Sequence, residues 1–383
     1  MRITFYGLNI HELRKGERLD AFLGSNKGWF TRIRNELVKT LNHKHILLGD
    51  SFVSYLMPLG RRFVSEISRY YFRRGAFEDI EKIAAIIVTF SAVGRAGECS
   101  YITYSQAEWN SIYEILVLDW NEVKTDKQMP MPFSHDHNDF ALLCFYFVMF
   151  CYFLVGGGSR FTTNPLFVNV IAERGMDNDD QTLVFPTLIN NAANKVTSYL
   201  KDCVGEIDEL PASVKICARG LRYGGLHEIQ NNMSAGHYAA LVRGGWAMDE
   251  KETRNTSSIY SVGNWESLMY GSKAIAGYPD VRVKVVSPTL EVLFELKPMG
   301  IEKLNSLLQE IYGPLHFNIL DSHIRPFAGA AFASFLRFLP DFEISLGRKH
   351  PILCIFEDHL RTCQLTYSQV IKNYYIITLM VTT

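Results

Sequence analysis

The stretch "IAAIIVTFSAVGRAGE" (residues 83–98) joins an apolar run to an arginine and, three residues later, to a glutamate. The apolar run continues a helical pattern from residue 79, so we predict a buried helix over 79–93. Arg95 and Glu98 stand at positions i and i+3, which share one face of a helix. A guanidinium beside a buried helix needs a charged partner or an anion. Two interpretations therefore stand: a structural ion pair, or a phosphate-binding arginine oriented by its own carboxylate.

Helical patterns also dominate the rest of the chain. The run "FALLCFYFVMFCYFLV" (140–155) has 16 uncharged residues. A membrane span needs ~20. We therefore predict a helix buried on all sides within a protein core, and no membrane partner. Further helices are expected over 30–41, 61–72, 190–204, 211–232, 237–246, 291–313 and 325–339.

A different pattern fills "IYEILVLDWNEVKTDKQMPMPF" (112–133), which is rich in β-branched and aromatic residues. It predicts two strands around the turn "WNEVKTDKQ", and Pro130 and Pro132 make the second strand an edge strand or a short one. The predicted fold class is therefore mixed α/β, mainly α-helical, with a small antiparallel β-hairpin sheet. The following loop "SHDHND" (134–139) has His and Asp too close together in sequence for an obvious metal site, so we predict no metal and no cofactor.

Charge and cysteine content narrow the class of protein. The whole chain of 383 residues has a net charge of −1, but residues 1–75 hold 14 Lys and Arg against 6 Asp and Glu, a local charge of +8. The run "RYYFRRG" (69–75) suits a phosphate backbone, although a solvated helix face produces the same pattern. Seven cysteines without Cys-x-x-Cys spacing, and a start without a secretory signal, indicate reduced thiols in an intracellular protein.

After Arg95, a lysine, a second arginine, a tryptophan and a tyrosine follow one another along the chain, each in a distinct local setting. Lys124 lies in the predicted hairpin turn, and Arg222 lies in the helical segment "ARGLRYGG" (218–225). Trp246 ends "GGW", and Tyr260 ends "SSIY". This order resembles the catalytic domain of the tyrosine recombinases, the phage integrase family. The segment "KAIAGYP" after the tyrosine resembles a divergent eukaryotic, transposon-like branch of that family.

The resemblance implies a role for each residue. Two arginines, Arg95 and Arg222, would neutralise the charge that develops on a phosphodiester, and Glu98 would orient the first of them. Lys124 would protonate the leaving 5′-oxygen, and Lys127, three residues away, is the alternative donor. The indole of Trp246 would donate a hydrogen bond to a phosphate oxygen.

The nucleophile implied by the resemblance is Tyr260, which would form a 3′-phosphotyrosyl bond. Tyr270, in "WESLMYGS", is the alternative because the spacing from Trp246 to Tyr260 is long for the family. The sequence also departs from the family at Arg219, which stands where the second arginine box has a histidine. A guanidinium does not accept a proton near neutral pH, so the usual proton-shuttle role has no candidate there.

The function implied is a site-specific DNA recombinase or integrase, a strand transferase that needs neither metal nor ATP. It would bind double-stranded DNA as a homo-tetramer, in the nucleus if the source is eukaryotic. We expect a basic helical N-terminal region over 1–75, short for a complete core-binding domain, a catalytic domain over 76–285 and a helical extension over 286–383. The alternatives are a degenerate DNA-binding relative, a type IB topoisomerase and a helical interaction protein without DNA activity.

Overall fold

The structure is a computed structural model, and it describes ten stretches of the chain. Four residues singled out above, Lys124, Lys127, Trp246 and Tyr260, lie outside these stretches, as does the helix expected over 30–41. The described residues are 56–103, 106–120, 129–137, 141–156, 184–188, 191–207, 216–245, 262–285, 302–312 and 325–371.

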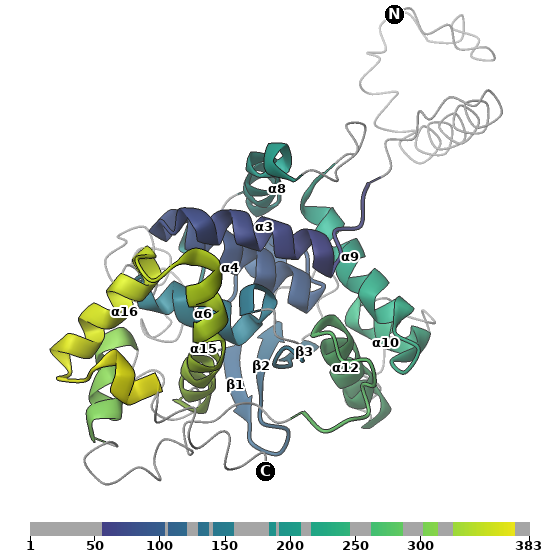
Figure 1. The fold of residues 1–383 in the computed structure, drawn as a ribbon. Helices are drawn as coiled ribbons and strands as arrows, with labels where there is room; N and C mark the ends of the chain where they lie inside the picture. The colour runs from purple at the N-terminus through teal and green to yellow at the C-terminus, as the bar shows by residue number, and fades with distance from the viewer. Residues whose placement is uncertain are drawn as a thin grey trace, which may run out of the picture. The chain divides into compact units, whose positions relative to one another are not determined.

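Helices make up most of the described residues (Figure 1). Two further stretches, 302–312 and 367–371, are also helical. The α-helices are α3 (Arg61–Arg74), α4 (Phe77–Ala92), α5 (Ala96–Cys99), α6 (Phe145–Leu154), α8 (Ala192–Asp202), α9 (Ala218–Asn231), α10 (Gly236–Arg243), α12 (Val262–Ile275), α15 (Arg325–Leu346) and α16 (Pro351–Thr362). Short 3-10 turns are η3 (Ala141–Leu143), η5 (Pro186–Leu188) and η6 (Val204–Glu206).

One three-stranded antiparallel sheet stands among these helices, in the order β1 (Ala107–Asn110), β2 (Ile115–Trp120) and β3 (Met129–Phe133). Leu118 faces Met131 and Trp120 faces Met129, so residues 121–128 connect an antiparallel pair. The hairpin prediction is therefore confirmed, and β3, with its two prolines, is an edge strand. The mainly helical, mixed α/β class is confirmed as well.

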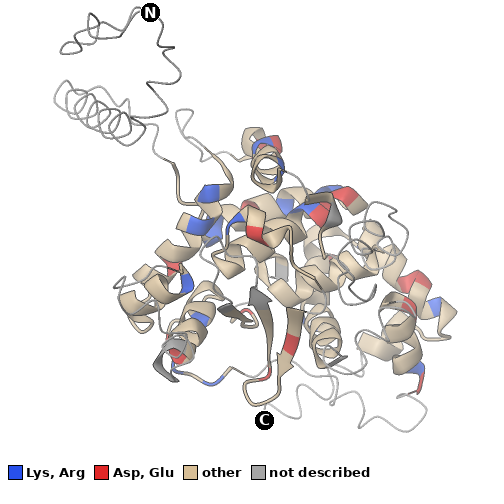
Figure 2. Ribbon diagram, turned by 180° about the vertical axis from the view of Figure 1, so that it is seen from behind, with Lys and Arg blue, Asp and Glu red and all other residues tan. Residues whose placement is uncertain are grey.

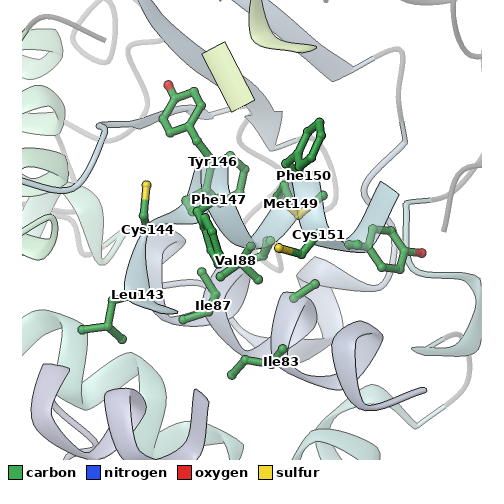
Figure 3. Packing of buried hydrophobic residues seen from close by; sticks show 14 of the residues in the cluster. Ile83, Ile87, Val88, Leu143, Cys144, Tyr146, Phe147, Met149, Phe150 and Cys151 are labelled. Carbon is green, nitrogen blue, oxygen red and sulfur yellow. The ribbon is translucent and has the colours of Figure 1, made fainter. Parts of the chain in front are cut away.

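The buried helix predicted from the aromatic run is α6, all ten residues of which are buried. One face of α6 packs on α4, where Ile83, Ile87 and Val88 lie toward it (Figure 3). Another face packs on α15, and Phe150 stacks 5.1 Å from Phe332. We call the following group the aromatic core: Phe147, Phe150, Phe332, Phe335 and Phe356.

This core joins helices from all three predicted regions, 1–75, 76–285 and 286–383. The compact unit runs from Leu56 to the C-terminus. Phe72 of α3 lies 5.9 Å from Phe147 of α6 and 5.7 Å from Phe342 of α15, as ring centroids. Segments before residue 76 and after residue 286 therefore share one hydrophobic core with α4 and α6. Within the described stretches, none of the helices has the length and apolarity that crossing a membrane demands.

Helix α9 is the element that departs most from its prediction. It begins at Ala218, and residues 216–217 before it are not helical, so the prediction of one continuous helix over 211–232 is wrong; Pro211 itself lies outside the described residues. Its glycines allow a very close backbone approach: a Cβ on Gly224 would stand 1.9 Å from the carbonyl oxygen of Leu59. A Cβ on Gly225 would stand 3.0 Å from the carbonyl oxygen of Phe90. The glycine pair therefore lets α9 lie against both the segment before α3, at Leu59, and the end of α4, at Phe90.

Candidate functional site

The turn after α4 positions Arg95. Val93 ends the helix in the left-handed region, with φ 56°, which is rare for a β-branched residue. The chain then turns into α5, and Arg95 is the residue just before that helix. The Glu98 carboxylate accepts from the Arg95 backbone N–H at 2.8 Å and from its Nη1 at 2.5 Å. The ion pair expected from the sequence is present, and it holds the guanidinium at the protein surface, 42% exposed.

Arg222 of α9 reaches the same turn from the far side. Its side chain is buried, and Nη1 donates to the carbonyl oxygen of Val93 at 3.0 Å, while Nη2 donates to the carbonyl oxygen of Gly244. Burial lowers the pKa of Arg222, the charge of Arg95 lowers it further, and Glu98 acts in the opposite direction. The structure therefore places Arg95, Glu98 and Arg222 at one turn, where their charges interact.

The other candidates in the described residues behave differently. Arg219 is exposed on α9, and so stands one turn before Arg222 with its side chain in solvent. Tyr270 of α12 is half-buried, and its hydroxyl donates to the Glu266 carboxylate. This hydrogen bond raises the pKa of Tyr270 because it favours the protonated phenol.

One arginine of this region was not singled out from the sequence. Arg243, the last residue of α10, is 2% exposed, and no described carboxylate forms an ion pair with it. Its donors go to three carbonyl oxygens: Nη1 to Leu268 at 3.1 Å, and Nη2 to Ser91 at 2.6 Å and Pro132 at 2.9 Å. Among the described residues Nε finds no hydrogen-bond partner, and burial lowers the pKa of Arg243 to about 9. The sequence feature that could have pointed to Arg243 is its place at the end of the apolar segment "YAALVRGG" (238–245).

We call the following residues the arginine junction: Arg95, Glu98, Arg222 and Arg243. They surround the C-terminal end of α4, where Ser91 and Val93 present carbonyl oxygens. Carbonyl oxygens at a helix C-terminus carry partial negative charge and favour nearby cations. This explains how two guanidinium groups are accommodated in the protein interior with only one carboxylate, Glu98, in the junction.

The loop that begins with Ser134 has a structural role in the described residues. Asp136 accepts from Arg61 of α3, with two donor–acceptor distances of 3.0 Å and one of 3.2 Å. His135 is fully buried; Nδ1 donates to the Asp136 carbonyl oxygen at 2.9 Å, and Nε2 accepts from the Ser334 hydroxyl at 2.8 Å. Within the ten described stretches, no group of three His, Cys, Asp or Glu side chains is arranged to hold a metal.

Charged residues of both signs share the helical surface, whereas the described strands contain no Lys or Arg (Figure 2). An anion that bound to the described residues would therefore meet a small group of basic side chains, such as the arginine junction, and not an extended basic surface. Comparison with known proteins finds no matching family model, no matching curated protein and no matching solved structure.

Proposed function

We propose that this protein is a DNA strand transferase of the tyrosine recombinase type, which cuts and rejoins DNA through a 3′-phosphotyrosyl intermediate. One observation carries the proposal: Arg95 and Arg222, which are remote in sequence, meet at the turn after α4, where Arg222 donates to the carbonyl oxygen of Val93 and Arg95 pairs with Glu98. Two guanidinium groups at one turn place positive charge at a site that is partly exposed at Arg95. Such a site suits a phosphodiester, whose negative charge grows in the transition state.

The chemistry follows from the residue types. A tyrosine oxygen forms a bond to phosphorus as the bond from phosphorus to the 5′-oxygen breaks. The leaving oxygen takes a proton from Lys124 or Lys127 in the hairpin connection, and water takes the tyrosine proton because Arg219 cannot accept it. We assign the nucleophile to Tyr260, on the resemblance in residue order, and keep Tyr270, whose hydroxyl donates to Glu266, as the alternative.

The test is a covalent-trapping assay without metal or ATP. Nicked and phosphorothiolate duplexes from the flanks of the encoding gene are incubated with wild type, Tyr260→Phe and Tyr270→Phe, and adducts are separated on denaturing gels. We expect an adduct in wild type and Tyr270→Phe, and none in Tyr260→Phe. Loss in Tyr270→Phe alone would transfer the role of nucleophile to that residue.

A second candidate function is DNA binding without cleavage. The observation in its favour is that Arg222 donates to two backbone carbonyl oxygens, which makes it a structural element of the α4 turn. Salt-dependent binding of the same duplexes with no adduct would support this candidate. Absence of binding would leave a helical interaction protein as the remaining interpretation.

A further inference from the structure

Arg243 lies where several secondary-structure elements come together. Its three acceptors belong to three different elements: Ser91 to α4, Pro132 to β3 and Leu268 to α12. The residue itself ends α10. A single guanidinium thus connects four elements that are far apart in the sequence.

Each of these four elements adjoins a predicted catalytic residue in the chain. Arg95 follows Ser91 by four residues, and Trp246 follows Arg243 by three. The connection that holds Lys124 enters β3, and Tyr260 precedes α12 by two residues. The fifth residue is linked through the neighbouring carbonyl group, because Arg222 donates to Gly244, which follows Arg243 directly.

We propose that Arg243 is a positioning residue, whose buried guanidinium sets the spacing of the segments that carry the catalytic residues. Its catalytic consequence rests on the function proposed above. A planar guanidinium suits this task because its donors diverge in fixed directions, whereas a lysine ammonium is a compact charge on a flexible stem. Burial strengthens the preference for arginine, because a buried carbonyl oxygen that loses its donor has no water to replace the hydrogen bond.

The surroundings of Arg243 offer a way to disturb the guanidinium without removing it. A Cβ on Gly271 of α12 would stand 2.9 Å from Cδ and 3.6 Å from Cβ of Arg243, and 3.3 Å from Cδ1 of Ile229 in α9. The substitution Gly271→Ala therefore crowds the arginine stem first and Ile229 second, while every donor stays present. It complements Arg243→Lys, which keeps the charge but loses the planar fork.

The first measurement reads the position of Arg222 and needs no DNA. Side-chain Nε–Hε resonances are recorded by ¹⁵N NMR, with Arg222 assigned through Arg222→Lys. In Arg243→Lys and in Gly271→Ala we expect a displaced Arg222 resonance and at least tenfold faster hydrogen exchange at Nε. Two controls, Arg361→Lys on the exposed face of α16 and Phe335→Leu in the aromatic core, should leave that resonance in place. An unmoved resonance in both test variants, or equal movement in Phe335→Leu, would overturn the proposal.

The second measurement reads the catalytic consequence. With the trapping duplexes we expect Arg243→Lys to form adduct about 100-fold more slowly, a loss of transition-state stabilisation of about 2.7 kcal/mol, while its DNA affinity stays within threefold. Phe335→Leu should keep both values. If wild type gives no adduct, the proposed function fails, and the NMR result still decides whether Arg243 positions Arg222. Equal losses of rate in Arg243→Lys and Phe335→Leu would reduce Arg243 to a general stabilising role.

Discussion

Two regions of α4 are packed in opposite ways. Along its length, the helix meets α6 and the aromatic core through side chains that have no charge. At its C-terminal end, it meets the arginine junction, where guanidinium groups donate to backbone carbonyl oxygens. The first region depends on filled volume, and the second depends on direction and close backbone approach. The two regions should therefore respond differently to substitution.

The largest expected effect lies in the aromatic core. Phe335 is fully buried, with its ring 4.7 Å from Phe150 and 5.0 Å from Phe356. Phe335→Ala should lower the free energy of unfolding by about 3–5 kcal/mol because it leaves a cavity. Phe335→Leu should cost about 1–1.5 kcal/mol. Urea unfolding measures both, and DNA affinity at a temperature where each variant is folded should stay within threefold of wild type. A large loss of affinity would mean that the two regions are coupled.

The next effect breaks the close backbone approach beside the arginine junction. Gly224→Ala places a methyl group against the carbonyl oxygen of Leu59, so we expect a loss of about 2–3 kcal/mol in unfolding free energy. Gly97→Ala in α5 is the matched control, since a Cβ there meets no atom within 4 Å. Equal stability of these two variants in urea would show that the segment at Leu59 moves away without cost.

A pH effect is expected at His135, where the aromatic side of the molecule meets the loop before α6. Its ring stacks on Phe338, and burial, aided by the charge of Arg337, lowers its pKa to about 4, against the effect of Asp136. In the unfolded chain the imidazole of His135 takes up a proton near pH 6.5, whereas in the folded protein it stays neutral until about pH 4. The free energy of unfolding therefore falls as the pH is lowered from about 6.5 to 4. Relative to His135→Gln, wild type should lose about 2–3 kcal/mol over that range.

The comparison with the variant is essential because the neighbouring carboxyl has the opposite dependence. Burial raises the pKa of Asp136 to about 7, although Arg61 opposes the shift. Its protonation in the folded chain adds stability as pH falls, so wild type alone will show a weaker trend. Unfolding in urea at several pH values measures the difference between wild type and His135→Gln. A difference that does not change with pH would mean that folding leaves the pKa of His135 unchanged.

The smallest effect on stability, with a specific effect on function, is expected for Glu98→Gln. The ion pair with Arg95 is partly exposed, so its loss should cost at most about 1 kcal/mol. Because the neutral amide holds the guanidinium less firmly, we expect adduct formation to slow about tenfold. Asp280→Asn, which removes an exposed pair with Arg282, is the control and should leave the rate unchanged. Equal rates in the two variants would count against an orienting role for Glu98.

The sequence predicted the regions that follow periodicity. The buried helices α4, α6 and α15, and the antiparallel pair β2 and β3, all came from patterns of apolar, β-branched and proline residues. The start of α9 was misjudged because Pro211 suits a first helical turn, and nothing local shows that the helix begins seven residues later.

The candidate site was predictable only in part. The ion pair of Arg95 and Glu98 followed from helical spacing, and the resemblance in residue order singled out Arg222 as a further candidate. Arg243 was missed because its acceptors are backbone carbonyl oxygens, which every residue possesses and which leave no mark in a sequence. Whether a guanidinium is buried without a carboxylate partner depends on the tertiary structure, so a sequence pattern does not predict it.

The edge strand β3 has one more consequence, for aggregation. Pro130 and Pro132 have no N–H to offer along the outer edge, and the carbonyl oxygen of Pro132 is already occupied by Arg243. An unfolded chain or a second molecule that approached this edge would find too few hydrogen-bonding groups to add a fourth strand. The same arginine that joins the helices thus also satisfies an outward carbonyl group of this strand, while the prolines keep the edge short of donors even where that arginine is replaced.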